Sequence, residues 1–517
     1  MAQRPAPVVQ LRSGTVRGFW RGADSAAFLG IPYAAPPVGA LRFAPPAPPA
    51  PWSGVRPACS YGPTPQRRPF DLITTIPEAT VPGEETLNLN VHTPHPASAG
   101  GTSGGLPVLV WIHGGGFVAG SPASPWYDGA SFNRAGVVVV TITYRLGFEG
   151  FGWLADAVPN RGVLDMVAAL EWVRDNVEAF GGDPENVTVA GQSAGAAAVV
   201  TLAVTPRAAG LFRRGIAMSG LTRIPPVDGA VRAGELMART AGVEPTREGW
   251  ATVGQDRLLD LQDWLRRGRR DDPLYLPRSI FGHGDPLARF GPVVDGDLIP
   301  YDLGEARRRG LLTVPLLLGS TAHEYTLALP AAARAALDGL TADAALDAAG
   351  APEEMASAIR QVHPELAGSL VVSQAWTDLN FRVPVVAFTA QPAHTWLYDF
   401  AWPSGVTGFA THGIDLVFAW GLPDADGVRD ACGPYLPGGL VADMHRAWAR
   451  FATDGDPGWA AAAGSLTGVR FGPEQAETDD LYGTERELHG LLGSLAGTRP
   501  HSWARPSGPP RPQAPVA

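Results

Sequence analysis

Short apolar runs rich in β-branched residues recur along the chain and alternate with helical patterns. The runs include PVLVWI, GVVVVTI and NVTVA, and later FRRGIAMSG, TVPLLLGS and HTWLYDFAW. Between two of them, VLDMVAALEWVRDNVEAF repeats its apolar residues at helical spacing. Apolar strands that alternate with helices indicate a parallel sheet buried on both faces. We therefore predict the α/β class, with a central, mostly parallel β-sheet flanked by helices.

Two stretches interrupt this alternation with mostly helical patterns, near residues 225–290 and 327–390. Ligands of parallel α/β folds bind at the carboxyl ends of the strands, so we expect these insertions to lie over that edge. The first seventy residues are rich in proline, which favours a surface or edge position. We predict a single domain over residues 1–498 and a disordered tail over residues 499–517.

Charge and composition narrow the function classes. Of the 517 residues 17% are charged, the formal net charge is −10, and every Lys or Arg position is Arg. The absence of lysine excludes Schiff-base and Ser–Lys mechanisms, and the acidic balance argues against a nucleic-acid partner. No run of eighteen apolar residues occurs and the start lacks a signal-like apolar stretch, so we expect a cytoplasmic protein that crosses no membrane. Cys59 and Cys432 are too few for a disulfide framework, although one bridge stays open.

The pattern Gly-x-Ser-x-Gly occurs twice, around Ser103 and around Ser193. With 63 glycines in the chain, the pattern alone is weak evidence. A nucleophile elbow needs a strand before the serine and a helix after it. Ser103 lies in a Gly/Ser/Pro loop, whereas Ser193 follows NVTVA and begins the helix-prone run AGAAAVV. We therefore predict that Ser193 is the nucleophile.

Three successive glycines follow the strand PVLVWI, in the segment His113-Gly114-Gly115-Gly116-Phe117. Glycines free the backbone to turn its N–H groups towards one point, where the negative charge of a tetrahedral intermediate develops. We predict an oxyanion hole formed by the amides of Gly115 and Gly116 together with that of Ala194. We also expect Phe117 and Gln192 to contact substrate.

The general base and its acid partner should follow Ser193 in the order acid, then histidine. His412 lies in a loop after a strand and next to a glycine, which suits a base that reaches across the sheet edge. His394 begins a strand, where we expect it to be packed, and helix periodicity accounts for His445. Glu324 follows the strand TVPLLLGS and is our predicted acid.

Two other acids, Asp295 and Asp415, compete with Glu324 for this role. Asp295 lies in an Asp-Gly-Asp segment that reads as a turn, and no strong strand delivers it. Asp415 is only three residues from His412, which is too local for the usual partner of the base.

With these residues assigned, the chain resembles the type-B carboxylesterase family, which includes bacterial para-nitrobenzyl esterases and the cholinesterases. The likeness extends over FLGIPYAAPPVGALRF, WIHGGGF, NRGVLDMVAALEWVRDNVEAFGGDPENVTVAGQSAG, FGPVVDGDLIP, VPLLLGSTAHEY and HGIDLVFAW. The family's Ser, Glu and His fall on Ser193, Glu324 and His412. The resemblance implies the α/β-hydrolase fold, in which helical insertions form an active-site gorge.

The chain departs from the family pattern at several positions. Gln192 replaces the family's Glu before the nucleophile, which removes a charge beside the serine. The acid motif reads His323-Glu324-Tyr325, and the Glu-Asp-Cys box reads Glu84-Glu85-Thr86, so the family's first disulfide is missing. The loop before Glu84 carries no Trp, so the choline site of the cholinesterases has no counterpart here and we do not expect a cholinesterase.

We therefore predict a carboxylic-ester hydrolase that acts through a covalent acyl-enzyme, without metal or cofactor. Its expected substrates are small to medium apolar or aromatic esters, and we expect a monomer, with an oligomer left open as the alternative. A carbamate or amide hydrolase would use the same residues and stays open as the alternative. A non-catalytic adhesion protein is the third hypothesis, but such domains typically lose triad members, and all three are present here.

Overall fold

The structure is a computed structural model of the 517-residue chain. It describes residues 4–69, 75–96, 105–220, 224–267, 272–282, 290–389 and 394–496. The predicted tail after residue 498 and Ser103 lie outside the described residues.

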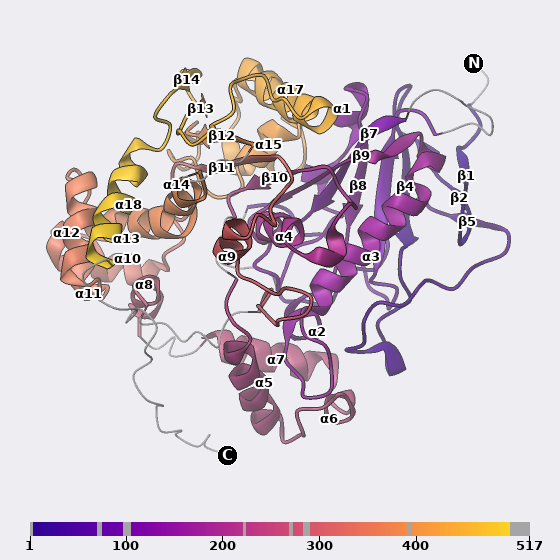
Figure 1. The fold of residues 1–517 in the computed structure, drawn as a ribbon, viewed down its shortest axis with the longest axis horizontal. Helices are drawn as coiled ribbons and strands as arrows, with labels where there is room; N and C mark the ends of the chain where they lie inside the picture. The colour runs from indigo at the N-terminus through magenta and orange to yellow at the C-terminus, as the bar shows by residue number, and fades with distance from the viewer. Residues whose placement is uncertain are drawn as a thin grey trace.

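A mixed sheet of eleven strands forms the centre of the molecule (Figure 1). Its middle strands, from β8 through β7, β9, β10, β11 and β12 to β13, pair in parallel. Antiparallel pairs close both edges. The mostly parallel sheet predicted from the apolar runs is therefore confirmed. In sheet order the strands are β14 (Ala476–Thr478), β13 (Gly468–Phe471), β12 (Thr395–Phe400), β11 (Leu316–Thr321), β10 (Arg214–Met218), β9 (Gly182–Gln192), β7 (Leu106–Ile112), β8 (Val138–Ile142), β6 (Asn88–Thr93), β4 (Ala26–Pro32) and β3 (Phe19–Trp20).

Helices cover both faces of this sheet. In β7, Val108, Val110 and Ile112 belong to one hydrophobic cluster, whereas Leu109 and Trp111 belong to another. The first cluster includes α3 (Arg161–Asn176) and α4 (Ala194–Ala203), and the second includes α15 (Asp415–Ala419) and α17 (Gly438–Asp454). Burial on both faces explains why these strands are continuous apolar runs.

Both predicted insertions contain helices. In Figure 1, α5 to α7 form a lobe at the bottom of the view, and α10 to α13 with α18 form a lobe at the left. The second lobe has its own hydrophobic cluster, which includes Ile359, Val371 and Leu488. The helices of the two lobes are α5 (Asp228–Ala241), α6 (Arg247–Ala251), α7 (Gln255–Arg267), α8 (Tyr275–Ile280), α10 (Ala331–Leu337), α11 (Ala342–Ala348), α12 (Glu353–Val362), α13 (Gly368–Thr377), η6 (Asp378–Arg382), α14 (Val383–Thr389) and α18 (Gly483–Ala496).

The proline-rich start lies at the periphery, as predicted. There β1 (Val8–Leu11), β2 (Gly14–Arg17) and β5 (Val55–Pro57) form a separate three-stranded sheet. The remaining helices connect the sheet strands: η1 (Gly39–Leu41), η2 (Pro125–Tyr127), α1 (Ala130–Arg134), α2 (Gly147–Phe151), η3 (Val177–Phe180), η4 (Pro206–Ala208), α9 (Leu303–Arg308) and α16 (Val428–Cys432).

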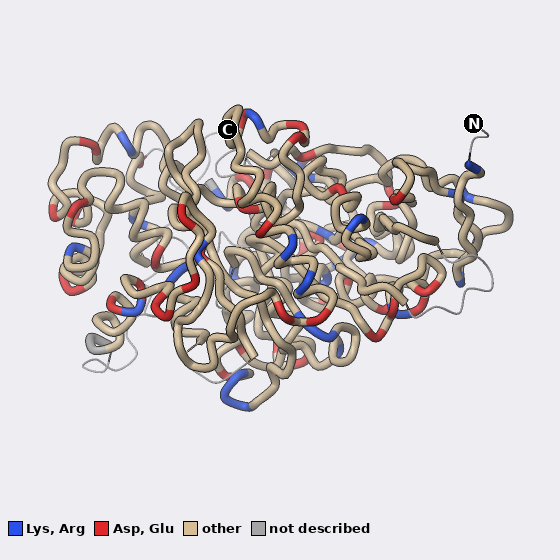
Figure 2. Tube along the Cα trace, turned by 90° about the horizontal axis from the view of Figure 1, so that it is seen from above, with Lys and Arg blue, Asp and Glu red and all other residues tan. Residues whose placement is uncertain are grey.

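Three further observations bear on the expectations about charge, membranes and disulfides. Arginines and acidic residues are interspersed along the described trace (Figure 2). None of the described helices combines the length and the apolar character needed to cross a membrane. Cys59 is exposed and Cys432 is buried, and both are free thiols, which settles the open question of a bridge.

Candidate active site

Ser193 lies at a sharp turn between β9 and α4. Its backbone has φ 57° and ψ −121°, in a region that a non-glycine residue enters only when its surroundings impose it. The Ser193 amide donates to the Met218 carbonyl of β10 at 2.8 Å, and the Ser193 carbonyl accepts from the Ala197 amide at 2.9 Å. The strand, the strained serine and the helix together form the nucleophile-elbow geometry.

Small residues allow this turn to form. A Cβ added at Gly195 would lie 2.0 Å from the Ile112 carbonyl oxygen at the end of β7. A Cβ added at Gly191 would lie 2.4 Å from the Gly195 carbonyl carbon. Glycine is therefore required at both positions, because the helix begins in direct backbone contact with the sheet.

The glycine loop after β7 lies beside this turn. Gly115 and Gly116 have φ values of 109° and 60°, which favour glycine. The Gly115 carbonyl accepts from the amides of Val118 and Ala119 at 3.0 and 2.9 Å. No hydrogen bond joins the amides of Gly115, Gly116 or Ala194 to another described residue. These three donors therefore remain available to an oxyanion.

His113 and Tyr144 brace the start of the glycine loop. The Tyr144 hydroxyl donates to the His113 carbonyl at 2.9 Å, and the two rings stack with centroids 4.6 Å apart. His113 Nδ1 lies 2.8 Å from the Gly114 carbonyl, to which it donates. Burial lowers the pKa of His113 to about 4, so the ring is neutral at pH 7. The sequence did not predict this role of Tyr144, because an apolar run that ends in Tyr does not indicate which neighbouring segment the Tyr contacts.

Glu324 and His412 meet at the carboxyl ends of β11 and β12. His412 Nδ1 lies 2.5 Å from Glu324 Oε2, and the His412 amide donates to the Glu324 carbonyl at 3.0 Å. The second carboxylate oxygen, Oε1, accepts from the Thr321 amide at 2.8 Å. Both side chains are buried. Glu324 therefore fixes the orientation of the imidazole and its tautomer.

Neither rival acid makes a hydrogen bond to His412 among the described residues. Asp295 forms the turn expected of it, since its Oδ1 accepts from the amides of Asp297 and Ile299 at 3.0 and 2.9 Å. Asp415 is buried, and its Oδ2 lies 3.0 Å from the Tyr398 hydroxyl. Burial, followed by the charge of Glu324, raises the pKa of Asp415 to about 7.

Neither His394 nor His445 is among the residues that line the pocket around Ser193. His445 Nδ1 lies 3.0 Å from the Ala419 carbonyl, within the helical layer. His394 is exposed rather than packed, so that expectation was wrong. It precedes β12, and the sheet begins to bury the chain only at Thr395.

A pocket brings the predicted nucleophile and base together, and Gln192 and part of the glycine loop line it as well. The remaining ring nitrogen of His412, Nε2, lies 3.1 Å from Gln192 Nε2. No hydrogen bond joins Ser193 Oγ to His412 among the described residues. Apo sites often show this, because the catalytic contact tightens only with substrate. The pocket is lined by Ile76, Pro77, Glu78, Gly114, Gly115, Gly120, Ser121, Tyr127, Gln192, Ser193 and His412.

Phe117 does not line this pocket. Its ring packs against Phe151 and Tyr144, with centroids 5.0 and 6.4 Å apart. A substrate contact for Phe117 stays a prediction, whereas Gln192 does line the pocket. Glu78, which the sequence reasoning did not select, also lines it and pairs with Arg67 at 3.1 Å.

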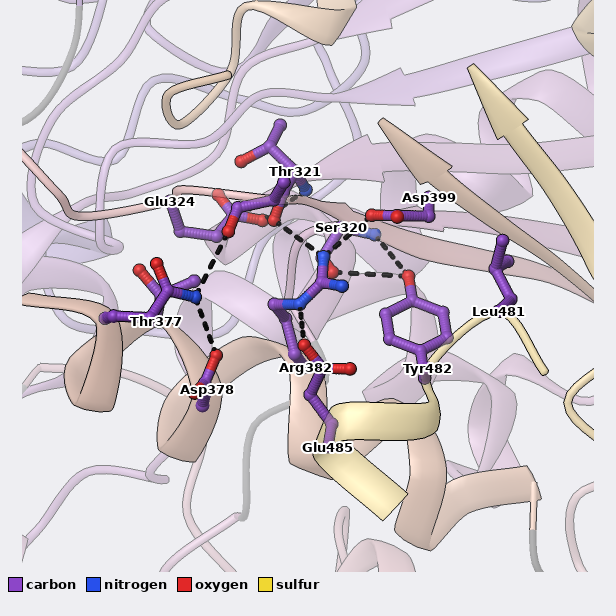
Figure 3. Close-up of polar contacts among 12 residues, drawn as sticks. Ser320, Thr321, Glu324, Thr377, Asp378, Arg382, Asp399, Leu481, Tyr482 and Glu485 are labelled. Carbon is purple, nitrogen blue, oxygen red and sulfur yellow. Dashed lines mark hydrogen bonds and ion pairs between the residues drawn. The ribbon is translucent and has the colours of Figure 1, made fainter. Parts of the chain in front are cut away.

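A buried ion network holds the loop that carries Glu324 (Figure 3). Arg382 Nη1 donates to Asp399 at 2.7 Å and to the Thr321 carbonyl at 3.2 Å, and Arg382 Nε pairs with Glu485 of α18. Burial alone would lower the pKa of Arg382, but the charges of Asp399 and Glu485 hold it above its ordinary value. Thr321 links this network to the acid, because its carbonyl accepts from Arg382 and its amide donates to Glu324.

The helical lobe adds further contacts to the same loop. Gln374 of α13 donates to the Ala322 carbonyl at 3.3 Å, and the Tyr325 amide donates to Thr377 Oγ1 at 3.1 Å. Gln374 also donates to Asp378 at 2.8 Å. Arg382 and Asp378 both lie in the π-helical turn η6, a feature that often marks functional sites. Nothing in the sequence pattern identified these residues.

Within the described residues, no group of three or more His, Cys, Asp or Glu side chains has the arrangement of a metal site.

Comparisons with known proteins agree on one family. The model of the carboxylesterase family matches residues 5–475. The chain is 34% identical to the para-nitrobenzyl esterase of Bacillus subtilis over 447 residues, which is 83% of this chain and 86% of that protein. It is 34% identical to the liver carboxylesterase of Sus scrofa over 511 residues, with 88% and 87% covered. A solved structure of a PNB esterase superposes with a TM-score of 0.78 at 30% identity, covering 94% of this chain and 99% of that one.

Proposed function

The chain belongs to the carboxylesterase family and has its α/β-hydrolase fold. From this premise we propose that Ser193, His412 and Glu324 carry out ester hydrolysis through a covalent acyl-enzyme. We propose small to medium apolar or aromatic esters as its substrates.

In the proposed acylation, Ser193 Oγ attacks the ester carbonyl and its proton passes to His412 Nε2. The amides of Gly115, Gly116 and Ala194 donate to the oxygen that becomes negative. The intermediate collapses, the C–O bond to the alcohol breaks, and His412 returns the proton to the leaving alkoxide. Water then attacks the acyl-enzyme by the same route and releases the acid.

The 2.5 Å contact between His412 Nδ1 and Glu324 Oε2 is the observation that supports this proposal most strongly. A carboxylate only accepts, so Nδ1 carries the hydrogen and Nε2 is left with the lone pair that a general base needs. The two residues lie in loops that follow separate strands, 88 positions apart in the sequence. Packing alone gives no reason for the imidazole of such a pair to line the same pocket as a strained serine.

The two Gly-x-Ser-x-Gly serines provide a matched test. Ser193→Ala should reduce turnover of a p-nitrophenyl ester by at least about a thousandfold, because the nucleophile is lost. Ser103→Ala should retain wild-type turnover. Retained activity in Ser193→Ala, or its loss in Ser103→Ala alone, would refute the assignment.

Carbamate or amide hydrolysis would use the same groups. The turnover of a matched ester and anilide distinguishes these reactions. We expect the ester to react faster, because an alkoxide leaves more readily than an amine, which must first take the proton from His412. An anilide that reacts as fast as its ester would favour the amide hydrolase instead.

A further inference from the structure

Gln192 makes a contact with the general base that the proposed chemistry does not use. Its side-chain Nε2 lies 3.1 Å from His412 Nε2, and Gln192 is 1% exposed. His412 Nε2 is the atom that must take the proton of Ser193. The base therefore has a second partner at its reactive nitrogen, supplied by the residue next to the nucleophile.

The hydrogen positions at this contact follow from the other side of the ring. His412 Nδ1 holds a hydrogen because it faces the carboxylate of Glu324. In the neutral imidazole, Nε2 then bears a lone pair and needs a donor. The carboxamide N–H₂ of Gln192 is such a donor, whereas an ionised glutamate at this position would place acceptor against acceptor.

The absence of a side chain at Gly114 leaves space beside the Gln192 carboxamide, since a Cβ there would lie 2.8 Å from Gln192 Oε1. The last side-chain torsion of glutamine has a broad, roughly two-fold profile, so a half-turn that exchanges Oε1 and Nε2 has a small torsional cost. The carboxamide can therefore present either its donor or its acceptor to His412.

We propose that Gln192 is a positioning residue that follows the protonation state of His412. It donates to Nε2 of the neutral base and, after a half-turn, accepts from the Nε2–H of the imidazolium formed when Ser193 attacks. This proposal rests on the proposed function, because His412 must be the general base for it to matter. As a consequence, the imidazolium form of His412 is stabilised by the dipole of the Gln192 carboxamide and not by a second negative charge beside that of Glu324.

The other charged and titratable groups near His412 come from three segments and stay constant in the test below. They are Glu324 after β11, Asp415 of α15, Tyr325 beside the ring, and Glu78 in the shared pocket, the last paired with Arg67. A negative charge within about 4–6 Å favours the charged form of a cation by about one to three pH units. Glutamate at position 192 should therefore keep His412 protonated to higher pH.

The test compares Gln192→Glu and Gln192→Met with wild type, using Gln10→Glu as a control that adds the same charge at an exposed position. The readouts are kcat/KM for a p-nitrophenyl ester and the rate of labelling by a fluorophosphonate, each measured against pH. In Gln192→Glu, the acid limb of both profiles should move up by about one to three pH units. In Gln192→Met, kcat should fall about tenfold at constant KM, and the limb should stay in place. Gln10→Glu should match wild type.

Unshifted limbs in a folded Gln192→Glu would overturn the proposal. If the glutamate variant does not fold, Gln192→Met decides, and wild-type kcat in that variant overturns the proposal as well. Failure of the proposed function looks different: wild type itself would neither turn over the ester nor take up the label. That result would remove both proposals.

Discussion

The two sides of the site are held in place by different means. On the nucleophile side, backbone atoms decide the geometry: Ser193 is strained between a strand and a helix, and glycines permit contact with the Ile112 carbonyl. On the acid side, charged side chains decide it: Arg382 ties the Glu324 loop to Asp399 and to Glu485, which lie far along the chain. The geometry of the nucleophile side should therefore be disrupted when atoms are added, and that of the acid side when a charge is removed.

Removing Arg382 should have the largest effect. Arg382→Met leaves Glu485 and part of Asp399 buried without their partner, so we expect the free energy of unfolding to fall by about 3–5 kcal/mol. Urea denaturation measures this loss. Arg446→Met is the matched control, because its pair with Asp443 is exposed, and it should change stability by less than about 1 kcal/mol. Equal losses in the two variants would show that the buried network does not hold the acid side.

Adding one methyl group tests the nucleophile side. In Gly195→Ala the new Cβ would lie 2.0 Å from the Ile112 carbonyl oxygen, so the start of α4 must shift and carry Ser193 with it. We expect kcat/KM to fall about 100-fold, the usual effect of a misplacement of about 1 Å. Gly229→Ala in α5, where a Cβ meets nothing within 4 Å, should leave kcat/KM unchanged. Normal activity in Gly195→Ala would contradict the backbone account of this side.

A buried carboxyl behind the acid gives a smaller effect that depends on pH. The pKa of Asp415 is about 7 in the folded protein, because of burial and the charge of Glu324, against an ordinary value of 3.8. Its proton therefore stabilises the folded state at low pH, and that stability is lost as the pH rises from about 4 through 7. Asp415→Asn keeps an acceptor for Tyr398 and never ionises. At pH 8 it should be more stable than wild type, with little difference at pH 4. An equal difference at both pH values would contradict the raised pKa.

His363 should give the smallest effect, at the edge of the same network. Burial opposes its protonation, but the hydrogen bond to Asp378 at 2.6 Å and the charge of Asp378 raise the pKa of His363 overall. The resulting stability is fully present below about pH 6.5, the ordinary histidine value, and is lost as the pH rises through the folded value. Wild type should therefore lose more stability between pH 6 and pH 8 in thermal unfolding than His363→Gln, which keeps only the loss due to Asp415. Equal losses of stability in the two proteins would contradict a contribution from His363.

The same contrast between backbone and side-chain control limits what the sequence could reveal about the site. Apolar runs predicted the parallel sheet, because the residue types of a segment favour a particular backbone geometry. For the same reason, the strand before Ser193 and the helix after it distinguished this serine from Ser103. The Arg382 network was invisible, since Thr321, Arg382 and Glu485 share no motif or spacing. Gln192 was recognised as a departure from the family, but its contact with His412 depends on a side-chain direction that no pattern encodes. The misjudged His394 shows the same limit, because burial begins only one residue later, at Thr395.

Trapping the acyl-enzyme tests the central claim most directly. The protein is mixed with p-nitrophenyl acetate, quenched in acid within the first turnover, digested and mapped by mass spectrometry. Our account predicts one acetyl group on the peptide that contains Ser193, and none on that peptide in Ser193→Ala. Acetyl on Ser103 or another residue, or a burst of p-nitrophenol with an unmodified Ser193, would contradict it.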